Sequence, residues 1–217
     1  MTGVLAAATV LSALLAIAAA PWALAMPWLA FVFKPLATVL VIVHAARRGA
    51  DAPVVRRWVL VGLVLSLAGD VALLWPREGF LPGLVSFLLA HLAYLVAFTR
   101  GVRFAARPLV FVGYGVVAAL ILAALWPGVP AALRLPVVAY VVCLAAMAAQ
   151  AAVVWASGAP RGAVLALGGA LFMASDALLA TNRFATPLPA ASLWILATYW
   201  AAQWCIASWL APRGVPR

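Results

Sequence analysis

The sequence predicts an all-α membrane protein, a bundle of eight transmembrane helices, from three observations. First, 69% of the 217 residues are hydrophobic and only 8% are charged, whereas a soluble domain carries about 25% charged residues. Second, apolar runs long enough to cross a bilayer as a helix, about 20 residues each, recur along the whole chain. Third, the basic residues between these runs alternate between a rich side and a poor side.

Proline, glycine and arginine separate the apolar runs. Pro21 and Pro27 divide the first two runs, and a segment with four arginines and Pro53 divides the second run from the third. The predicted spans cover residues 3–20, 28–46, 58–75, 83–100, 108–126, 135–156, 162–181 and 190–210. They leave only short connections, so residues 1–217 are expected to form a single integral membrane domain.

The first run admits a second interpretation. Residues 4–20 resemble the core of a signal peptide, and Ala23-Leu24-Ala25 resembles a cleavage site. The basic segment that begins a signal peptide is missing, and the run is long enough to span. We therefore expect a retained first helix.

The basic residues assign the two sides of the membrane. Ten of them fall on one side: Arg47, Arg48, Arg56, Arg57, Arg100, Arg103, Arg107, Arg161, Arg213 and Arg217. Three fall on the other side, namely Arg77, Arg134 and Arg183, while Lys34 lies within a span. Because positive charge accumulates in cytoplasmic loops, both termini are expected in the cytoplasm, with the chain in a bacterial inner membrane. The net charge of +10 thus reflects orientation, and nucleic-acid binding is not expected.

Two segments suggest an internal repeat. Residues 67–74, around Asp70, resemble residues 173–180, around Asp176, at an offset near half the chain length. Both spans run in the same direction, which fits a parallel duplication of four helices. The match is short in an alanine-rich chain, so coincidence is an equally simple explanation.

Four ionisable residues lie at membrane depth: Lys34, Asp70, His91 and Asp176. At 1.5 Å per residue, all four lie about 8 to 12 Å from the non-cytoplasmic ends of their spans. Ionisable groups in the membrane are costly and usually face the bundle interior at functional sites. We therefore predict one polar pocket in the outer half of the bundle. Further polar side chains at helical spacing are expected to extend it: Tyr94, Tyr199 and Gln203.

Structural roles are the alternative for each residue. Lys34 can extend its ammonium to the interface, and either aspartate can pair with it simply to hold the bundle together. His91 can be a packing residue bonded to a carbonyl. Tyr94, Tyr199 and Gln203 can be interhelical hydrogen bonds. His44 and most tryptophans lie near span ends, where interfacial positions are expected.

Two carboxyl groups in one pocket of low dielectric are expected to differ in protonation state, one ionised beside Lys34 and the other protonated. This arrangement of an acid and a carboxylate is used to cleave bonds through oxocarbenium-like states. A proton-coupled transporter requires the same groups. No metal-binding or cofactor-binding motif is found, and Cys143 and Cys205 lie in apolar spans as small hydrophobic residues.

Five segments together resemble the YhhN family, the lysoplasmalogenase-like membrane proteins of bacteria and animals. They are Lys34-Pro35-Leu36, Gly69-Asp70, His91-Leu92-Ala93-Tyr94, residues 168–176 ending in Ser175-Asp176, and Thr198-Tyr199-Trp200-Ala201-Ala202-Gln203. The resemblance covers nearly the whole chain. Trp200 departs from the tyrosine that is common in the family at this position.

The resemblance implies hydrolysis of the vinyl-ether bond of a lysoplasmalogen to a fatty aldehyde and glycerophosphoethanolamine or glycerophosphocholine, without metal or organic cofactor. Asp70 and Asp176 are then the catalytic acid and the stabilising carboxylate, in an order left open. Lys34, His91, Tyr94, Tyr199 and Gln203 are then substrate-binding residues, and the lysolipid substrate and membrane lipids are the partners. Two other functions stay open: a proton-coupled small-molecule transporter and a non-catalytic lipid-binding protein.

Overall fold

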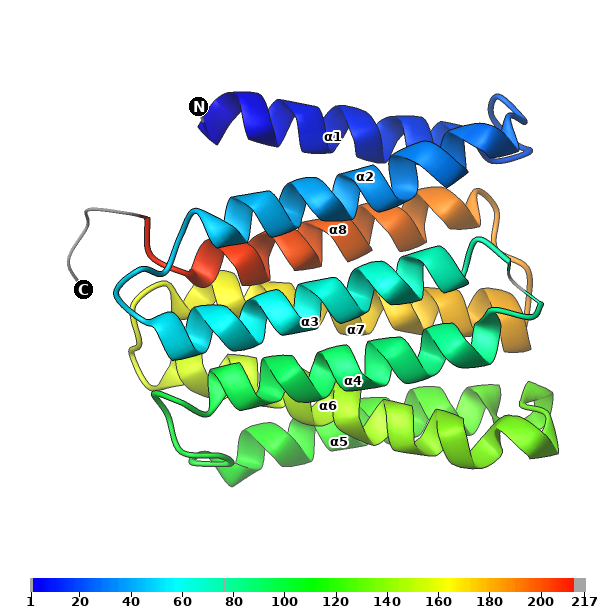
Figure 1. The fold of residues 1–217 in the computed structure, drawn as a ribbon. Helices are drawn as coiled ribbons and strands as arrows, with labels where there is room; N and C mark the ends of the chain where they lie inside the picture. The colour runs from blue at the N-terminus through cyan, green and yellow to red at the C-terminus, as the bar shows by residue number, and fades with distance from the viewer. Residues whose placement is uncertain (1, 76, 213–217) are drawn as a thin grey trace.

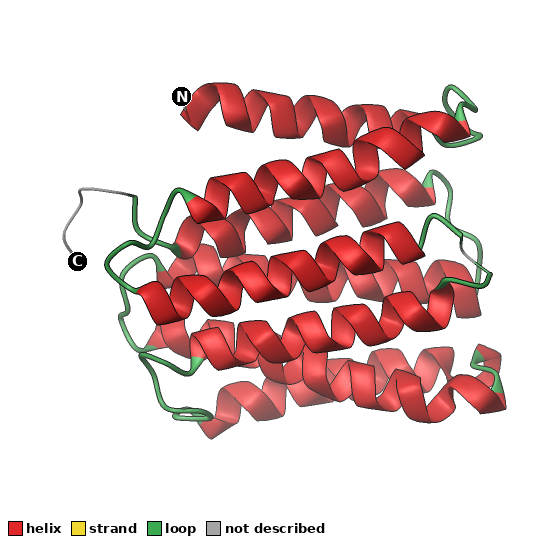
Figure 2. Ribbon diagram, in the orientation of Figure 1, coloured by secondary structure: helices red, strands yellow, loops and turns green. Residues whose placement is uncertain are grey.

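A computed structural model describes residues 2–75 and 77–212, and it is built from helices. Eight α-helices follow one another: α1 (Thr2–Ala18), α2 (Pro27–Ala46), α3 (Pro53–Ala72), α4 (Phe80–Phe98), α5 (Pro108–Leu125), α6 (Arg134–Ala156), α7 (Gly162–Phe184) and α8 (Ala191–Trp209). Two short 3₁₀ turns, η1 (Trp126–Gly128) and η2 (Ala131–Leu133), join α5 to α6. Over these ranges there is no strand, as Figure 2 shows, so the predicted all-α class is confirmed.

The helices lie side by side, with successive helices running in opposite directions (Figure 1). Helix α1 lies at one edge of the bundle and α5 at the opposite edge, while α3, α4, α7 and α8 lie between them. The start of α1 and the end of α8 lie at the same end of the bundle. The loops α1–α2, α3–α4, α5–α6 and α7–α8 are therefore gathered at the other end.

The helix bounds agree with the predicted spans to within a few residues, but α3 begins five residues earlier than expected. Arg56 and Arg57, predicted to lie in a loop, belong to its first turns. Pro53 explains the difference, because a proline in the first turn of a helix lacks only an N–H that has no helical partner there. The apolar run therefore marks only part of α3. Arg213 and Arg217, counted above on the cytoplasmic side, lie outside the described residues.

Five segments are long and apolar enough to cross a membrane: Pro27–Ala46, Phe80–Phe98, Pro108–Gly128, Ala131–Ala156 and Gly162–Phe184. Their outward faces carry large apolar side chains such as Leu109, Leu120 and Val142. A surface of this kind suits lipid and not water, and the chain is an integral membrane protein. Helices α1, α3 and α8 are shorter or more polar than these five.

Adjacent glycines bring α7 close to two neighbours. A Cβ atom on Gly168 would lie 3.1 Å from the Ala202 carbonyl oxygen of α8. On Gly169 it would lie 3.1 Å from the Ala148 Cα atom of α6. Small residues allow such close packing between membrane helices. The close packing fixes α7 between α6 and α8, two turns before Asp176.

At the end of the bundle that holds the start of α1, Arg48 fastens α8 to the loop after α2. Its Nε atom donates to the Leu210 carbonyl at 2.8 Å, and its Nη2 atom donates to the Ser208 carbonyl at 3.2 Å. The backbone N–H of Gly49 donates to the Ala211 carbonyl at 2.8 Å. These donors satisfy carbonyls that a helix end leaves without partners. Burial, with a contribution from Arg161, lowers the pKa of the Arg48 guanidinium.

Candidate functional site

A cavity of about 960 Å³ lies at the end of the bundle opposite the start of α1. Its wall comes from α1, α2, α3, α4, α7 and α8 and the loops between them, and it includes Lys34, Asp70, Asp176 and Tyr199. We call this space the polar cavity. The structure thus brings together three of the four ionisable residues singled out in the sequence. His91, Tyr94 and Gln203 are not part of its wall.

Asp70 is the most heavily hydrogen-bonded side chain of the site. The Lys34 Nζ atom lies 3.7 Å from Asp70 Oδ1 and donates to the Asp70 backbone carbonyl at 3.1 Å. The hydroxyls of Thr38 and Tyr199 donate to Asp70 Oδ2 at 2.6 Å and 2.7 Å. With one cation and two hydroxyl donors around it, and only 2% of its surface exposed, Asp70 is arranged to hold a negative charge.

Two chains of hydrogen bonds support these donors. In one, Tyr94 donates to Gln203 Oε1 at 2.7 Å, and Gln203 Nε2 donates to the Tyr199 hydroxyl at 3.2 Å. In the other, the Trp200 indole N–H donates to Thr38 Oγ1 at 3.1 Å. Tyr94 and Gln203 thus act on Asp70 through Tyr199. The indole of Trp200 thus holds the Thr38 hydroxyl that donates to Asp70.

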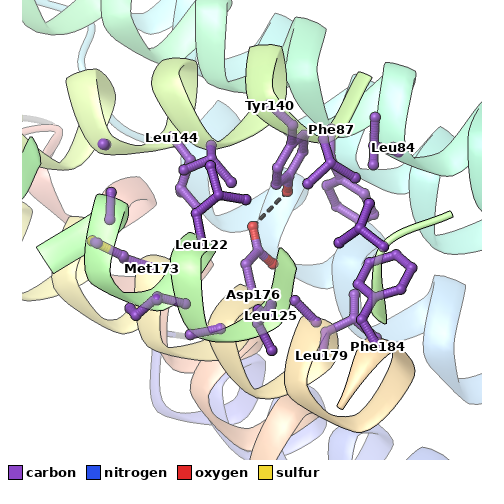
Figure 3. A pocket seen from close by; sticks show the side chains of 18 of the residues that line it. Leu84, Phe87, Leu122, Leu125, Tyr140, Leu144, Met173, Asp176, Leu179 and Phe184 are labelled. Carbon is purple, nitrogen blue, oxygen red and sulfur yellow. Dashed lines mark hydrogen bonds between the residues drawn. The ribbon is translucent and has the colours of Figure 1, made fainter. Parts of the chain in front are cut away.

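Asp176 has different surroundings. The Tyr140 hydroxyl donates to Asp176 Oδ2 at 2.5 Å, as Figure 3 shows. Where Asp70 meets an ammonium group, Asp176 thus meets a phenol. The Asp176 side chain is half-buried, with the Tyr140 phenol as its neutral donor, and it lines the polar cavity.

Asp176 also borders a second space, a pocket of about 90 Å³ between α4, α5, α6 and α7 (Figure 3). Tyr140 and Asp176 are the polar residues of its wall, and the remaining wall residues are apolar. We call this space the apolar pocket. It and the polar cavity have five wall residues in common: Leu73, Phe80, Phe87, Asp176 and Leu179.

His91 lies behind Tyr140, outside both walls. Its ring is fully buried and makes edge contacts with Tyr140 and Phe172, at centroid distances of 5.2 Å and 4.6 Å. Neither ring nitrogen has a hydrogen-bond partner among residues 2–75 and 77–212. His91 is thus placed to position the Tyr140 ring and not to contact a molecule in the polar cavity.

Sequence reasoning missed Tyr140, and one signal could have found it. Lys34 and Asp70 are 36 residues apart, and so are Tyr140 and Asp176. Applying the offset of the suggested repeat to Lys34 leads directly to Tyr140. In the part of the chain that the structure describes, no three His, Cys, Asp or Glu side chains gather as a metal site.

Comparisons with known proteins identify relatives of this chain. The model of the YhhN family matches residues 29–210. Lysoplasmalogenase TMEM86B of Homo sapiens is 37% identical over 156 residues, which cover 71% of this chain and 64% of the human protein. Its counterpart in Sus scrofa is 40% identical over 148 residues, 65% of this chain and 58% of that protein. Lysoplasmalogenase of Mycobacterium tuberculosis is 33% identical over 174 residues, 74% of this chain and 63% of that protein. The chain thus spans less than two thirds of the length of these relatives. No solved structure matches it.

The Lys34–Asp70 pair generates a stability prediction. Lys34→Met leaves the Asp70 charge buried without its cation, so we expect the free energy of unfolding in detergent to fall by about 3–5 kcal/mol. The double variant Lys34→Met/Asp70→Asn removes the charge as well and is expected to recover most of the loss. Arg100→Met, at an exposed loop position, controls for the loss of one positive charge. Equal losses in the single and double variants would contradict an ionised Asp70.

Proposed function

This chain belongs to the YhhN family, and on that premise we propose that it is a lysoplasmalogenase. The proposed reaction is hydrolysis of the vinyl-ether bond of a lysoplasmalogen to a fatty aldehyde and glycerophosphoethanolamine or glycerophosphocholine. The names of the human and mycobacterial relatives support this substrate class. The observation that carries the proposal is the pair of aspartates facing one cavity with different partners, Lys34 for Asp70 and Tyr140 for Asp176.

We assign the acid to Asp176. Its protonated carboxyl delivers a proton to the second carbon of the alkenyl chain, and the double-bond electrons form the new C–H bond. The first carbon and the ether oxygen then share a positive charge as an oxocarbenium ion. Tyr140 holds Asp176 Oδ2, so the proton leaves from Oδ1. General acid catalysis of this kind contributes about 10²- to 10⁴-fold in rate.

Asp70 is the stabilising carboxylate. Its negative charge is fixed in place by Lys34, Thr38 and Tyr199 before the reaction starts, so stabilising the cation requires no rearrangement. Water then adds to the first carbon, and its proton returns to the Asp176 carboxylate. The bond from the resulting hemiacetal to the glycerol oxygen then breaks: Asp176 gives its proton to that oxygen and takes the hydroxyl proton of the hemiacetal, which releases the aldehyde and the glycerol headgroup.

The headgroup is placed in the polar cavity. This cavity is lined by two cationic side chains, Lys34 and Arg183. The Arg183 guanidinium lies 4.1 Å from the centre of the Phe80 ring. Two cations at the wall suit the phosphate of a lysolipid. Tyr199 belongs to the same wall, whereas Tyr94, Gln203 and His91 act in this proposal by positioning Tyr199 and Tyr140.

We also propose that all eight helices cross a bacterial inner membrane as one domain, with both termini in the cytoplasm. The two halves of the chain are proposed to form a parallel repeat of four helices each. Packing supports the repeat, because α2 contacts α3 and α8 just as α6 contacts α7 and α4. Equivalent positions of the two halves then hold Lys34 and Tyr140, and Asp70 and Asp176.

Topology can be tested with reporter fusions. Fusions after Arg57, Arg107 and Arg217 are expected to report the cytoplasm, because basic residues concentrate at these positions. A fusion beside Glu78 is expected to report the opposite side. A periplasmic signal after Arg217 would contradict eight spans with both termini inside.

The catalytic assignment can be tested with Asp70→Asn and Asp176→Asn. Each is expected to lower aldehyde release from a vinyl-ether lysolipid by about 10²- to 10⁴-fold, because asparagine neither donates this proton nor carries the negative charge. Aldehyde is measured by mass spectrometry, with folding checked by chromatography in detergent. The wild-type rate is expected to be bell-shaped against pH, since the reaction needs one protonated and one ionised carboxyl.

Asp51→Asn is the matched control, since it makes the same substitution at an exposed position in a turn, outside the polar cavity and the apolar pocket. It is expected to retain aldehyde release. Wild-type rates in both asparagine variants would rule out this mechanism. Uptake of a small molecule driven by a pH gradient, with no aldehyde from any lysolipid, would favour a transporter instead.

A further inference from the structure

We propose that the apolar pocket binds the first few carbons of the lipid chain, so that the two spaces beside Asp176 divide the substrate between them. The polar cavity takes the headgroup and the apolar pocket takes the start of the alkenyl chain. This inference rests on the proposed function and adds the site that holds the reacting end of the chain.

The position of Asp176 leads to this division. A lysoplasmalogen has one polar part and one chain, and the carbon that must be protonated is the second carbon of the chain. The acid must therefore lie where the headgroup site ends and the chain site begins. Asp176 belongs to the walls of both spaces, and it is the single ionisable residue that they share in the described parts of the chain.

The chemistry of the pocket wall also fits a chain. Around Tyr140 and Asp176 the wall is apolar, with contributions from Phe87 on α4, Ala118 on α5, Leu144 on α6 and Met173 on α7. Ala118 and Leu144 are 6% exposed and Met173 is 8% exposed. A hydrocarbon gains by leaving water for such surroundings, whereas a phosphate or an ammonium group would lose its hydration there.

The size of the pocket limits how much of the chain it holds. An apolar cavity of roughly 150 Å³ accommodates benzene with its six carbons, so a pocket of about 90 Å³ accommodates about three or four. Ile121 and Leu122 on α5 belong to the wall and are only partly buried. The rest of the chain therefore leaves along α5 toward the lipid. The pocket then selects the structure of the chain next to the ether bond and is insensitive to total chain length.

Filling the pocket from α5 tests the proposal. Ala118→Phe places a ring in the pocket, whereas Ala119→Phe places the same ring on the exposed face of the same helix. We expect Ala118→Phe to raise KM for a vinyl-ether lysolipid about 50-fold, the effect of withdrawing about three carbons from apolar contact. Inhibition by glycerophosphoethanolamine, which has no chain, should stay unchanged. Ala119→Phe should resemble the wild type.

Enlarging the pocket provides a second variant that does not depend on fitting a ring. Two substrates are compared, one with a methyl branch on its fourth chain carbon and one without a branch. Met173→Ala is expected to raise kcat/KM for the branched substrate, relative to the unbranched one, about tenfold. Equal KM values for Ala118→Phe and Ala119→Phe, or an unchanged ratio in Met173→Ala, would overturn the proposal.

Cross-linking separates this proposal from the proposed function, because it needs no hydrolysis. The probe is a saturated alkyl-ether lysolipid with a diazirine on its fourth chain carbon. Cross-links on α5, α6 and α7 residues of the pocket support the chain site, even if no lysolipid yields aldehyde and the proposed activity is wrong. Cross-links confined to α1 and α2 would overturn the chain site, even if aldehyde is formed.

Discussion

The ion pair between Lys34 and Asp70 is the interaction on which the arrangement of this bundle depends. A charge taken into a membrane costs several kcal/mol unless it is paired and hydrogen-bonded. Four helices share that task, since Lys34 and Thr38 come from α2, Asp70 from α3, and Tyr199 from α8, with Tyr94 of α4 behind it. The pair therefore fixes how α2, α3, α4 and α8 meet. It also keeps one negative charge at the wall of the polar cavity.

The second aspartate, Asp176, differs from Asp70 in the residue that it pairs with. Asp176 stands at the same spacing from Tyr140 as Asp70 does from Lys34, but its partner carries no charge. If the pairs Lys34–Asp70 and Tyr140–Asp176 come from one duplicated pair, the first has a lysine where the second has a tyrosine. Such a difference would yield one ionised and one protonated carboxyl. Acid-base chemistry on a vinyl ether needs this pairing of unlike states. Glycine contacts of α7 with α6 and α8 hold the helix that carries Asp176 in place.

Much of the fold could be predicted from the sequence, and less of the site. Apolar length located the helices, and five short segments identified the family, which the match over residues 29–210 confirms. Counting residues from the span ends gave the common depth of Lys34, Asp70, Asp176 and His91. Depth does not fix which face of a helix a residue occupies, so Lys34, Asp70 and Asp176 line the polar cavity whereas His91 lies behind Tyr140. Tyr140 itself was missed because a tyrosine in an apolar run resembles a packing residue until its partner is known.

The unlike protonation of the two aspartates is the central claim, and infrared spectroscopy tests it most directly. The purified protein at neutral pH is expected to show the carbonyl stretch of a protonated carboxylic acid in a buried site. Asp176→Asn should remove this band, and Asp70→Asn should leave it in place. A band that disappears in Asp70→Asn and persists in Asp176→Asn, or no such band in the wild type, would contradict the account.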